Sequence, residues 1–273
     1  PCALITGRLL GRKARYRTLA MVAILFIITG GLLPLILNSL GLILAARAMM
    51  GVGLGILNPI TPSVTMLELS KDRARRQMGI NGATANTAAI IYQLIGGFAC
   101  AISWRYSFLA YLLVIPALPI VMLYLREPEI VPEHDKSVQS QTIGSAVRMF
   151  GKPYWGWFAL HFFFIVLFYA YITNISSIIA NNHFGTASAS ALVLAVFSIG
   201  GVIGGYTMSR LITKIDKGVF ILAGVICFIG KIILVTGDSL LMIYLGSLVY
   251  GLGYGVMLPA ISLFSGMSVA PQQ

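Results

Sequence analysis

The sequence predicts an all-α integral membrane protein whose helices form two related bundles. Its composition is the first reason, because 58% of the residues are hydrophobic, 10% are charged and the mean hydropathy is +0.90. Soluble domains carry about 25% charged residues, so a water-soluble core could not hide this much apolar surface. The second reason is a series of eight apolar runs of membrane-crossing length, and the third is an internal repeat.

Eight apolar runs of the chain are predicted to cross the membrane as helices. A helix needs about 20 apolar residues to span the hydrocarbon region. Residues 2–6 are too few for this and are expected to be the end of a further helix that begins earlier. The predicted spans are residues 19–36, 42–67, 80–102, 108–125, 154–179, 187–209, 219–236 and 240–264.

Lysine and arginine residues are distributed unevenly between the breaks that separate these spans. Every second break carries most of them, and the intervening breaks carry only Arg105. Positive residues mark cytoplasmic loops, so the net charge of +11 is a topology signal rather than a nucleic-acid-binding surface. Arg47 and Lys231 lie inside spans. The sixteen on the cytoplasmic side are Arg8, Arg12, Lys13, Arg15, Arg17, Lys71, Arg73, Arg75, Arg76, Arg126, Lys136, Arg148, Lys152, Arg210, Lys214 and Lys217.

One cytoplasmic loop, residues 126–153, differs from the others. It is polar, contains Pro128 and Pro132, which interrupt a continuous helix, and carries four of the eight acidic residues. We interpret it as the linker between an N-terminal bundle of residues 1–125 and a C-terminal bundle of residues 154–273.

The motif G-x-G-x-G-x-x-x-P occurs twice, beginning at Gly51 and at Gly251, an offset of 251 − 51 = 200 residues. A weaker pair, GRLLGR from Gly7 and GYTMSR from Gly205, recurs at an offset of 205 − 7 = 198 residues. Such repeats are expected of transporters built from duplicated units. Two complete units would need about 400 residues, so we expect an interior fragment of a protein with six helices in each half.

Three sequence motifs together resemble the major facilitator superfamily of secondary transporters. Residues 7–19, GRLLGRKARYRTL, are similar to its signature between the second and third helices, with Gly11 where that signature has an aspartate. Arg47-x-x-x-Gly51 is similar to a fourth-helix signature, and residues 104–108, WRYSF, to a turn between helices five and six. The resemblance implies a major-facilitator-type bundle of two pseudo-symmetric halves, in which helices equivalent to 3–10 of 12 are present.

The same resemblance implies secondary active transport of a small molecule by alternating access. Residues 92–97, YQLIGG, keep only the last two glycines of the exporter motif G-P-x-x-G-G, and this departure weakens the support for an antiporter without removing it. Export of drugs or metabolites is favoured, and import of nutrients or organic ions by a symporter or uniporter is the alternative. The resemblance also implies an inner gate, in which we expect Glu68 to pair with Arg12 or Arg15. The inner-gate candidates are Gly7, Arg12, Arg15, Glu68 and Arg210.

Polar side chains inside the spans are candidates for the substrate pathway. A charge at mid-bilayer costs about 2.5 to 3.5 kcal/mol on insertion scales, so Arg47 needs a partner or a water-filled cavity, unless its head snorkels to the interface. Snorkelling is the expectation for Lys231. The other polar residues could instead hold helices together by hydrogen bonds. The pathway candidates are Arg47, Asn58, Asn86, Gln93, Tyr171, Asn174, Tyr250 and Tyr254.

The chemistry of the remaining residues limits the mechanism. No acidic residue lies in the apolar part of a span, so a coupling ion, H⁺ or Na⁺, would use a carboxylate elsewhere or His161. Three scattered histidines and three cysteines without metal-ligand spacing predict no metal site, no cofactor and no catalytic centre, which leaves a membrane enzyme as a remote alternative. We expect a monomer in the plasma (inner) membrane, with no nucleic-acid partner.

Overall fold

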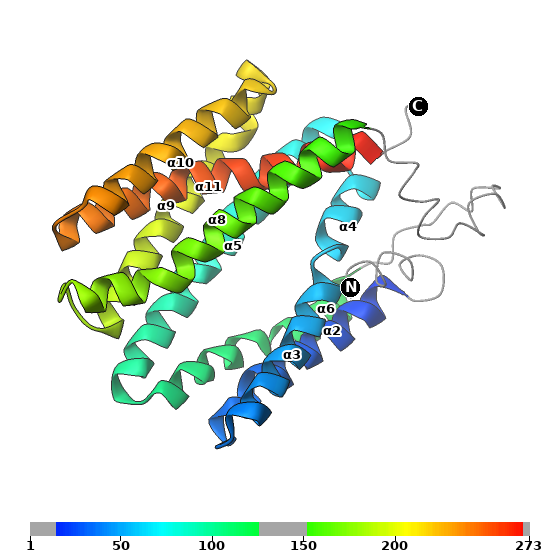
Figure 1. The fold of residues 1–273 in the computed structure, drawn as a ribbon. Coiled ribbons are helices and arrows are strands. Elements are labelled where there is room, and N and C mark those ends of the chain that lie inside the picture. Colours follow the sequence, from blue (N-terminus) through cyan, green and yellow to red (C-terminus); the bar gives the residue numbers. More distant parts are fainter. Residues whose placement is uncertain (1–14, 126–151, 270–273) are drawn as a thin grey trace. The chain divides into compact units, whose positions relative to one another are not determined.

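A computed structural model describes residues 15–125 and 152–269, and every element in these ranges is a helix (Figure 1). Eight stretches of the described chain are long and apolar enough to cross a membrane. The all-α class and the predicted number of spans are therefore confirmed. The stretches are Tyr16–Leu35, Leu40–Thr65, Asp72–Ile102, Trp104–Tyr124, Trp155–Asn181, Ser188–Ile215, Gly218–Thr236 and Leu240–Ser265.

The contacts divide the chain into two compact units, residues 1–70 with 91–129 and residues 71–90 with 130–273. The helix α5 (Lys71–Ile102) contributes to both units, since its residues 71–90 belong to unit 2 and its residues 91–102 to unit 1. The bundle boundaries expected from the sequence stay a prediction. The described elements of unit 1 are α2 (Tyr16–Leu32), η1 (Leu33–Leu35), α3 (Leu40–Leu57), α4 (Ile60–Glu68), η2 (Trp104–Val114) and α6 (Ala117–Tyr124). Those of unit 2 are α8 (Lys152–Asn181), α9 (Ala187–Ile215), α10 (Gly218–Thr236) and α11 (Leu240–Val269).

Close backbone approach holds the core of unit 2 together. In Figure 1, α11 lies between α9 and α10, and glycines line both of its interfaces. A methyl group added to Gly204 of α9 would meet the carbonyl oxygen of Leu252, and one added to Gly253 of α11 would lie 2.9 Å from the carbonyl oxygen of Ala223. Membrane helices associate through such small residues because lipid offers no hydrophobic drive between them.

The internal repeat is visible in the contacts of the two units. In each unit, glycines bring a helix and the next helix in the chain together at equivalent places. In unit 1 the contacts are Gly53 against Ala23 and Gly30 against Met50. In unit 2 they are Gly253 against Ala223 and Gly230 against Tyr250. All four positions of the first unit recur exactly 200 residues later, for example 253 − 53 = 200. The pair α2 and α3 is thus equivalent to the pair α10 and α11.

The basic segment before the third span is helical, which corrects the prediction of a loop. The span was expected to begin at residue 80, but α5 begins at Lys71. Arginine is a good helix former, and Asp72 in the first turn complements the positive end of the helix dipole. The sixth span also continues past residue 209, so Arg210 and Lys214 lie in the last turns of α9. Several residues assigned to basic loops are therefore helix ends.

The two copies of the repeated motif end differently at their prolines. Proline lacks a backbone N–H and clashes with the preceding turn. At Pro59 the chain leaves α3 after Leu57 and starts α4 at Ile60, so the predicted helix 42–67 is interrupted. Pro259 instead lies within continuous α11. A methyl group on Gly82 of α5 would come within 2.8 Å of the Pro259 ring, so packing supports this proline inside the helix.

The span predicted as one α-helix over residues 108–125 is wound differently. It begins as an 11-residue 3₁₀-helix, η2, and continues after Pro116 as α6. A 3₁₀-helix has 3.0 residues per turn, so side chains three residues apart lie directly above one another. Phe108 and Tyr111 therefore share one edge of η2.

Candidate functional site

Arg47 in α3 is held inside unit 1 by aromatic side chains of η2. Its Nη1 donates hydrogen bonds to the Tyr111 hydroxyl at 2.9 Å and to the Met50 sulfur at 3.3 Å. Its guanidinium carbon lies 4.6 Å from the centre of the Phe108 ring and 5.4 Å from that of Tyr111. The edge of η2 that carries Phe108 and Tyr111 is thus the surface that contacts the cation.

Tyr111 owes its position to a glycine on the neighbouring helix. A methyl group added to Gly31 of α2 would lie 2.5 Å from Cγ of Tyr111, so the ring packs where any larger side chain would stand. The ring is wedged against α2 on one side and turns its hydroxyl to Arg47 on the other. Arg47 was expected to have a partner or a water-filled cavity, and in the described chain its hydrogen-bond partners are Tyr111 and Met50 rather than a carboxylate.

A cavity of about 440 Å³ adjoins this cation in unit 1. It shares Met50 and Tyr111 with the surroundings of Arg47. Apolar side chains dominate its wall, and polar atoms come from Tyr92, Ser107 and Tyr111. The lining residues are Ile27, Met50, Leu54, Leu57, Tyr92, Ser107, Ala110, Tyr111 and Val114. An apolar cavity beside one cation suits a ligand with an apolar body and a negative group.

Unit 2 contains a cluster of aromatic rings drawn from three helices. Phe197 of α9 stands at its centre, with its ring 5.3 Å from Tyr171, 5.4 Å from Tyr250 and 5.2 Å from Tyr254. Phe168 stacks on Tyr254 at 4.3 Å. The three tyrosines predicted for the substrate pathway are therefore brought together, in offset arrangements that favour aromatic attraction.

Polar atoms of the same cluster are satisfied unequally. The Tyr171 hydroxyl donates to Oγ of Ser247 at 2.9 Å. The Tyr250 hydroxyl is buried and has no hydrogen-bond partner among the described residues. Lys231 does not snorkel as expected: its Nζ donates to the Leu167 carbonyl at 2.9 Å and lies 4.8 Å from the centre of the Tyr250 ring. The cluster therefore has its own cation.

The predicted amides occupy separate places. Asn86 is 9% exposed, donates to the Gly82 carbonyl at 2.8 Å and packs against Gly201 of α9, so its side chain serves helix packing. Asn174 is exposed and donates to the Ala170 carbonyl of its own helix. Asn58 is exposed at the end of α3, and Gln93 is half-buried in the part of α5 that belongs to unit 1.

The inner-gate candidates are only partly described. Gly7 and Arg12 lie outside the described residues. Arg15 and Glu68 are both exposed in unit 1 and form no ion pair with each other, and Arg210 is exposed near the end of α9 in unit 2. Asp72 and Arg75 of α5, 3.7 Å apart, form an ion pair. The described ranges, residues 15–125 and 152–269, hold no group of three potential metal ligands.

Sequence reasoning missed Tyr111, Phe108 and Phe197 as organising residues. Phe108 and Tyr111 are aromatic residues in an apolar run, and their three-residue spacing also occurs among ordinary packing residues of membrane helices. Phe197 lies in a run of apolar residues and has no polar atom, so nothing in the sequence separates it from ordinary core.

Comparison with known families gives one match. The sequence model described as Major Facilitator Superfamily matches residues 1–273. None of the curated proteins compared with the chain matches it.

Proposed function

The chain belongs to the major facilitator superfamily, and from this premise we propose that it carries an organic anion across the membrane by alternating access. Members of this family are secondary transporters of small molecules, and the eight apolar helices make the chain a multi-pass integral membrane protein. The observation that carries the proposal is the cation of Arg47, which lies beside an apolar cavity without a carboxylate partner in the described chain.

The distribution of charge supports an anionic substrate. Each unit holds a cation inside a span, Arg47 in unit 1 and Lys231 in unit 2, that lies against a tyrosine ring. The described acidic residues lie at span ends or between helices: Glu68, Asp72, Asp216 and Asp238. A charge in the bilayer is costly unless it is paired, so a site with unpaired cations gains most from a negative ligand.

The aromatic cluster of unit 2 supports a substrate with a ring or another flat apolar part. Tyr171, Tyr250 and Tyr254 offer π-faces together with polar hydroxyls, and the Tyr250 hydroxyl is free within the described chain to bind a substrate or a water molecule. We propose export as the direction, H⁺ or Na⁺ as the coupling ion and the plasma membrane as the location. Import by a symporter or uniporter is the alternative.

The test is transport by the full-length protein in proteoliposomes. Aromatic carboxylates and aromatic amines of matched size are offered under an imposed pH or Na⁺ gradient, with protein-free liposomes as the blank. We expect saturable flux of the carboxylates and competition among them. Flux of the amines without competition by carboxylates would contradict the anion proposal. The same assay in inside-out vesicles gives the direction.

Topology gives a separate prediction. The basic breaks between spans place residues 126–153 in the cytoplasm. A single cysteine introduced at Ser140 should resist a membrane-impermeant thiol reagent in intact cells and react after permeabilisation. A cysteine at Ser39, in the break on the opposite side, is the matched control and should react in intact cells. The reverse pattern would invert the topology.

A further inference from the structure

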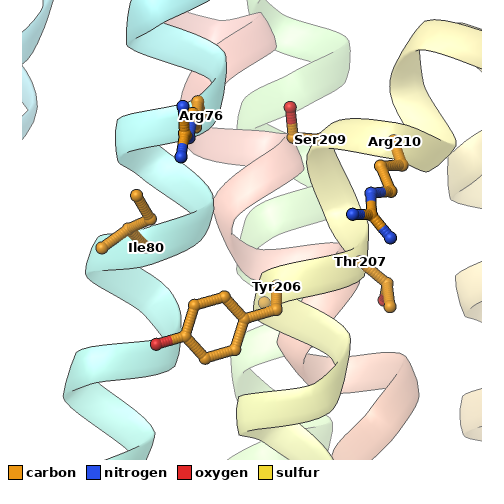
Figure 2. Close-up of a pocket in the computed structure, with 7 residues that line it drawn as sticks. Arg76, Ile80, Tyr206, Thr207, Ser209 and Arg210 are labelled. Carbon is orange, nitrogen blue, oxygen red and sulfur yellow. The ribbon is translucent and has the colours of Figure 1, made fainter.

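The basic ends of α5 and α9 enclose a cavity that the transport proposal does not use. These two helices of unit 2 touch through glycines: a methyl group on Gly79 would lie 2.7 Å from the carbonyl oxygen of Gly205. Beyond this contact, towards the start of α5 and the end of α9, a cavity of about 430 Å³ opens (Figure 2). Its lining residues are Arg76, Ile80, Gly205, Tyr206, Thr207, Ser209 and Arg210.

The charged groups of this cavity are all positive. Figure 2 shows Arg76 on α5 and Arg210 on α9, with Ser209 between them. Neither arginine forms an ion pair or a hydrogen bond in the described part of the chain. The carboxylate nearest to Arg76 along α5, that of Asp72, is paired with Arg75 at 3.7 Å. Two guanidinium groups that line one cavity without an anion repel each other, so an anion bound in the cavity would be stabilised by both.

A second cavity extends the same positive surface. Its volume is about 490 Å³, it shares Thr207 and Arg210 with the first, and it adds Lys214 one turn further along α9. Thr207 donates to carbonyl groups of its own helix at 3.0 and 3.1 Å, so its hydroxyl is already used. The donors left for a ligand come from the cations and from the hydroxyl groups of Tyr206 and Ser209. No carboxylate lines either cavity.

We propose that these adjoining cavities bind a phosphate group, held by Arg76 and Arg210 with Lys214 as a further positive charge. Guanidinium groups bind phosphate oxygens through paired, charge-assisted hydrogen bonds, which a flexible ammonium group does not reproduce. Arg210 lies in the last turns of the membrane span Ser188–Ile215, and the end of a membrane span is where a helix meets the lipid headgroups. The phosphate can therefore come from an anionic lipid or from a soluble phosphate compound, and basic pockets between helices at this depth suit the lipid.

Two arms of one experiment distinguish these sources. The full-length protein is placed in nanodiscs of phosphatidylcholine alone or of phosphatidylcholine with phosphatidylglycerol, and retained phosphatidylglycerol is counted by native mass spectrometry. In the second arm, inorganic phosphate is titrated into the phosphatidylcholine discs, and the shift of the unfolding midpoint is measured. The variants are Arg76→Gln, Arg210→Gln and their double. Lys217→Gln, at the same basic end but outside both cavities, is the matched control.

We expect the double variant to retain at least tenfold less phosphatidylglycerol than wild type, whereas Lys217→Gln behaves as wild type. A phosphate-induced shift that the double variant loses would assign the site to a soluble phosphate instead. If the double variant does not fold, Arg76→Lys and Arg210→Lys should each weaken binding while keeping the charge. Equal responses of all variants and of the control in both arms would overturn the proposal. That result is also expected if a carboxylate of the chain itself occupies the site.

Discussion

Arg47→Lys should lower the initial transport rate at least tenfold, and Arg47→Ala should abolish transport while the protein still reaches the membrane. Lysine keeps the charge but loses the planar guanidinium group that lies over the Phe108 ring and donates to the Tyr111 hydroxyl. A hydrogen bond from a charged group contributes about 1.5 to 3 kcal/mol and a desolvated cation–π contact about 2 kcal/mol, which together exceed the 1.4 kcal/mol of a tenfold effect.

The matched control for this substitution is Arg105→Lys. Arg105 also lies beside an aromatic ring, 5.3 Å from the centre of Trp104, and it bonds to Asn38, but it is half-buried at the end of a span. Its conservative variant should transport at nearly the wild-type rate. Initial rates are compared at matched surface expression. Near-normal rates for Arg47→Lys with partial activity for Arg47→Ala would remove Arg47 from the site.

Gly253→Ala should destabilise the protein by about 1 to 3 kcal/mol, the usual cost of overpacking. The added methyl group would lie 2.5 Å from the sulfur of Cys227 and 2.9 Å from the carbonyl oxygen of Ala223, and the backbone of α10 would have to move. The repeat extends this prediction to the first unit. Gly53→Ala, which meets the carbonyl oxygen of Ala23 at 2.6 Å, should have a similar effect.

Gly224→Ala is the control, because its methyl group would meet only the end of Met257, at 3.8 Å, an ordinary contact. It should leave stability unchanged or raise it slightly, since alanine favours helix more than glycine does. Thermal unfolding in detergent and the yield of folded protein measure both effects. Similar midpoints for Gly253→Ala and Gly224→Ala would show that the close approach of α10 and α11 does not limit stability.

The number of spans and the repeat could be predicted because both depend on local composition and on sequence identity at a fixed offset. Whether the helix continues through each of the two prolines could not be predicted. Pro59 and Pro259 stand in the same motif, yet only the second is kept within a helix, where Gly82 of α5 admits its ring. That difference arises from a helix that is distant in the sequence, which a local pattern does not contain.

The candidate site was predictable in its cation and not in its partners. The cost of a charge in the bilayer singled out Arg47, and the same rule applied to Lys231, whose side chain nevertheless turns to Leu167 and Tyr250 rather than to the interface. Finding Tyr111 required the winding of η2 and the space left by Gly31. Both are properties of packing between helices.

The 3₁₀ winding of η2 also sets how far its span reaches. Eleven residues rise about 22 Å in a 3₁₀-helix and about 16 Å in an α-helix, so the span Trp104–Tyr124 is longer than its residue number indicates. A thin bilayer favours the shorter, α-helical winding and a thick one the extended winding, because apolar length follows hydrocarbon thickness. Since the 3₁₀ form places Phe108 directly above Tyr111, a change of winding with bilayer thickness would alter the contacts of both rings with Arg47.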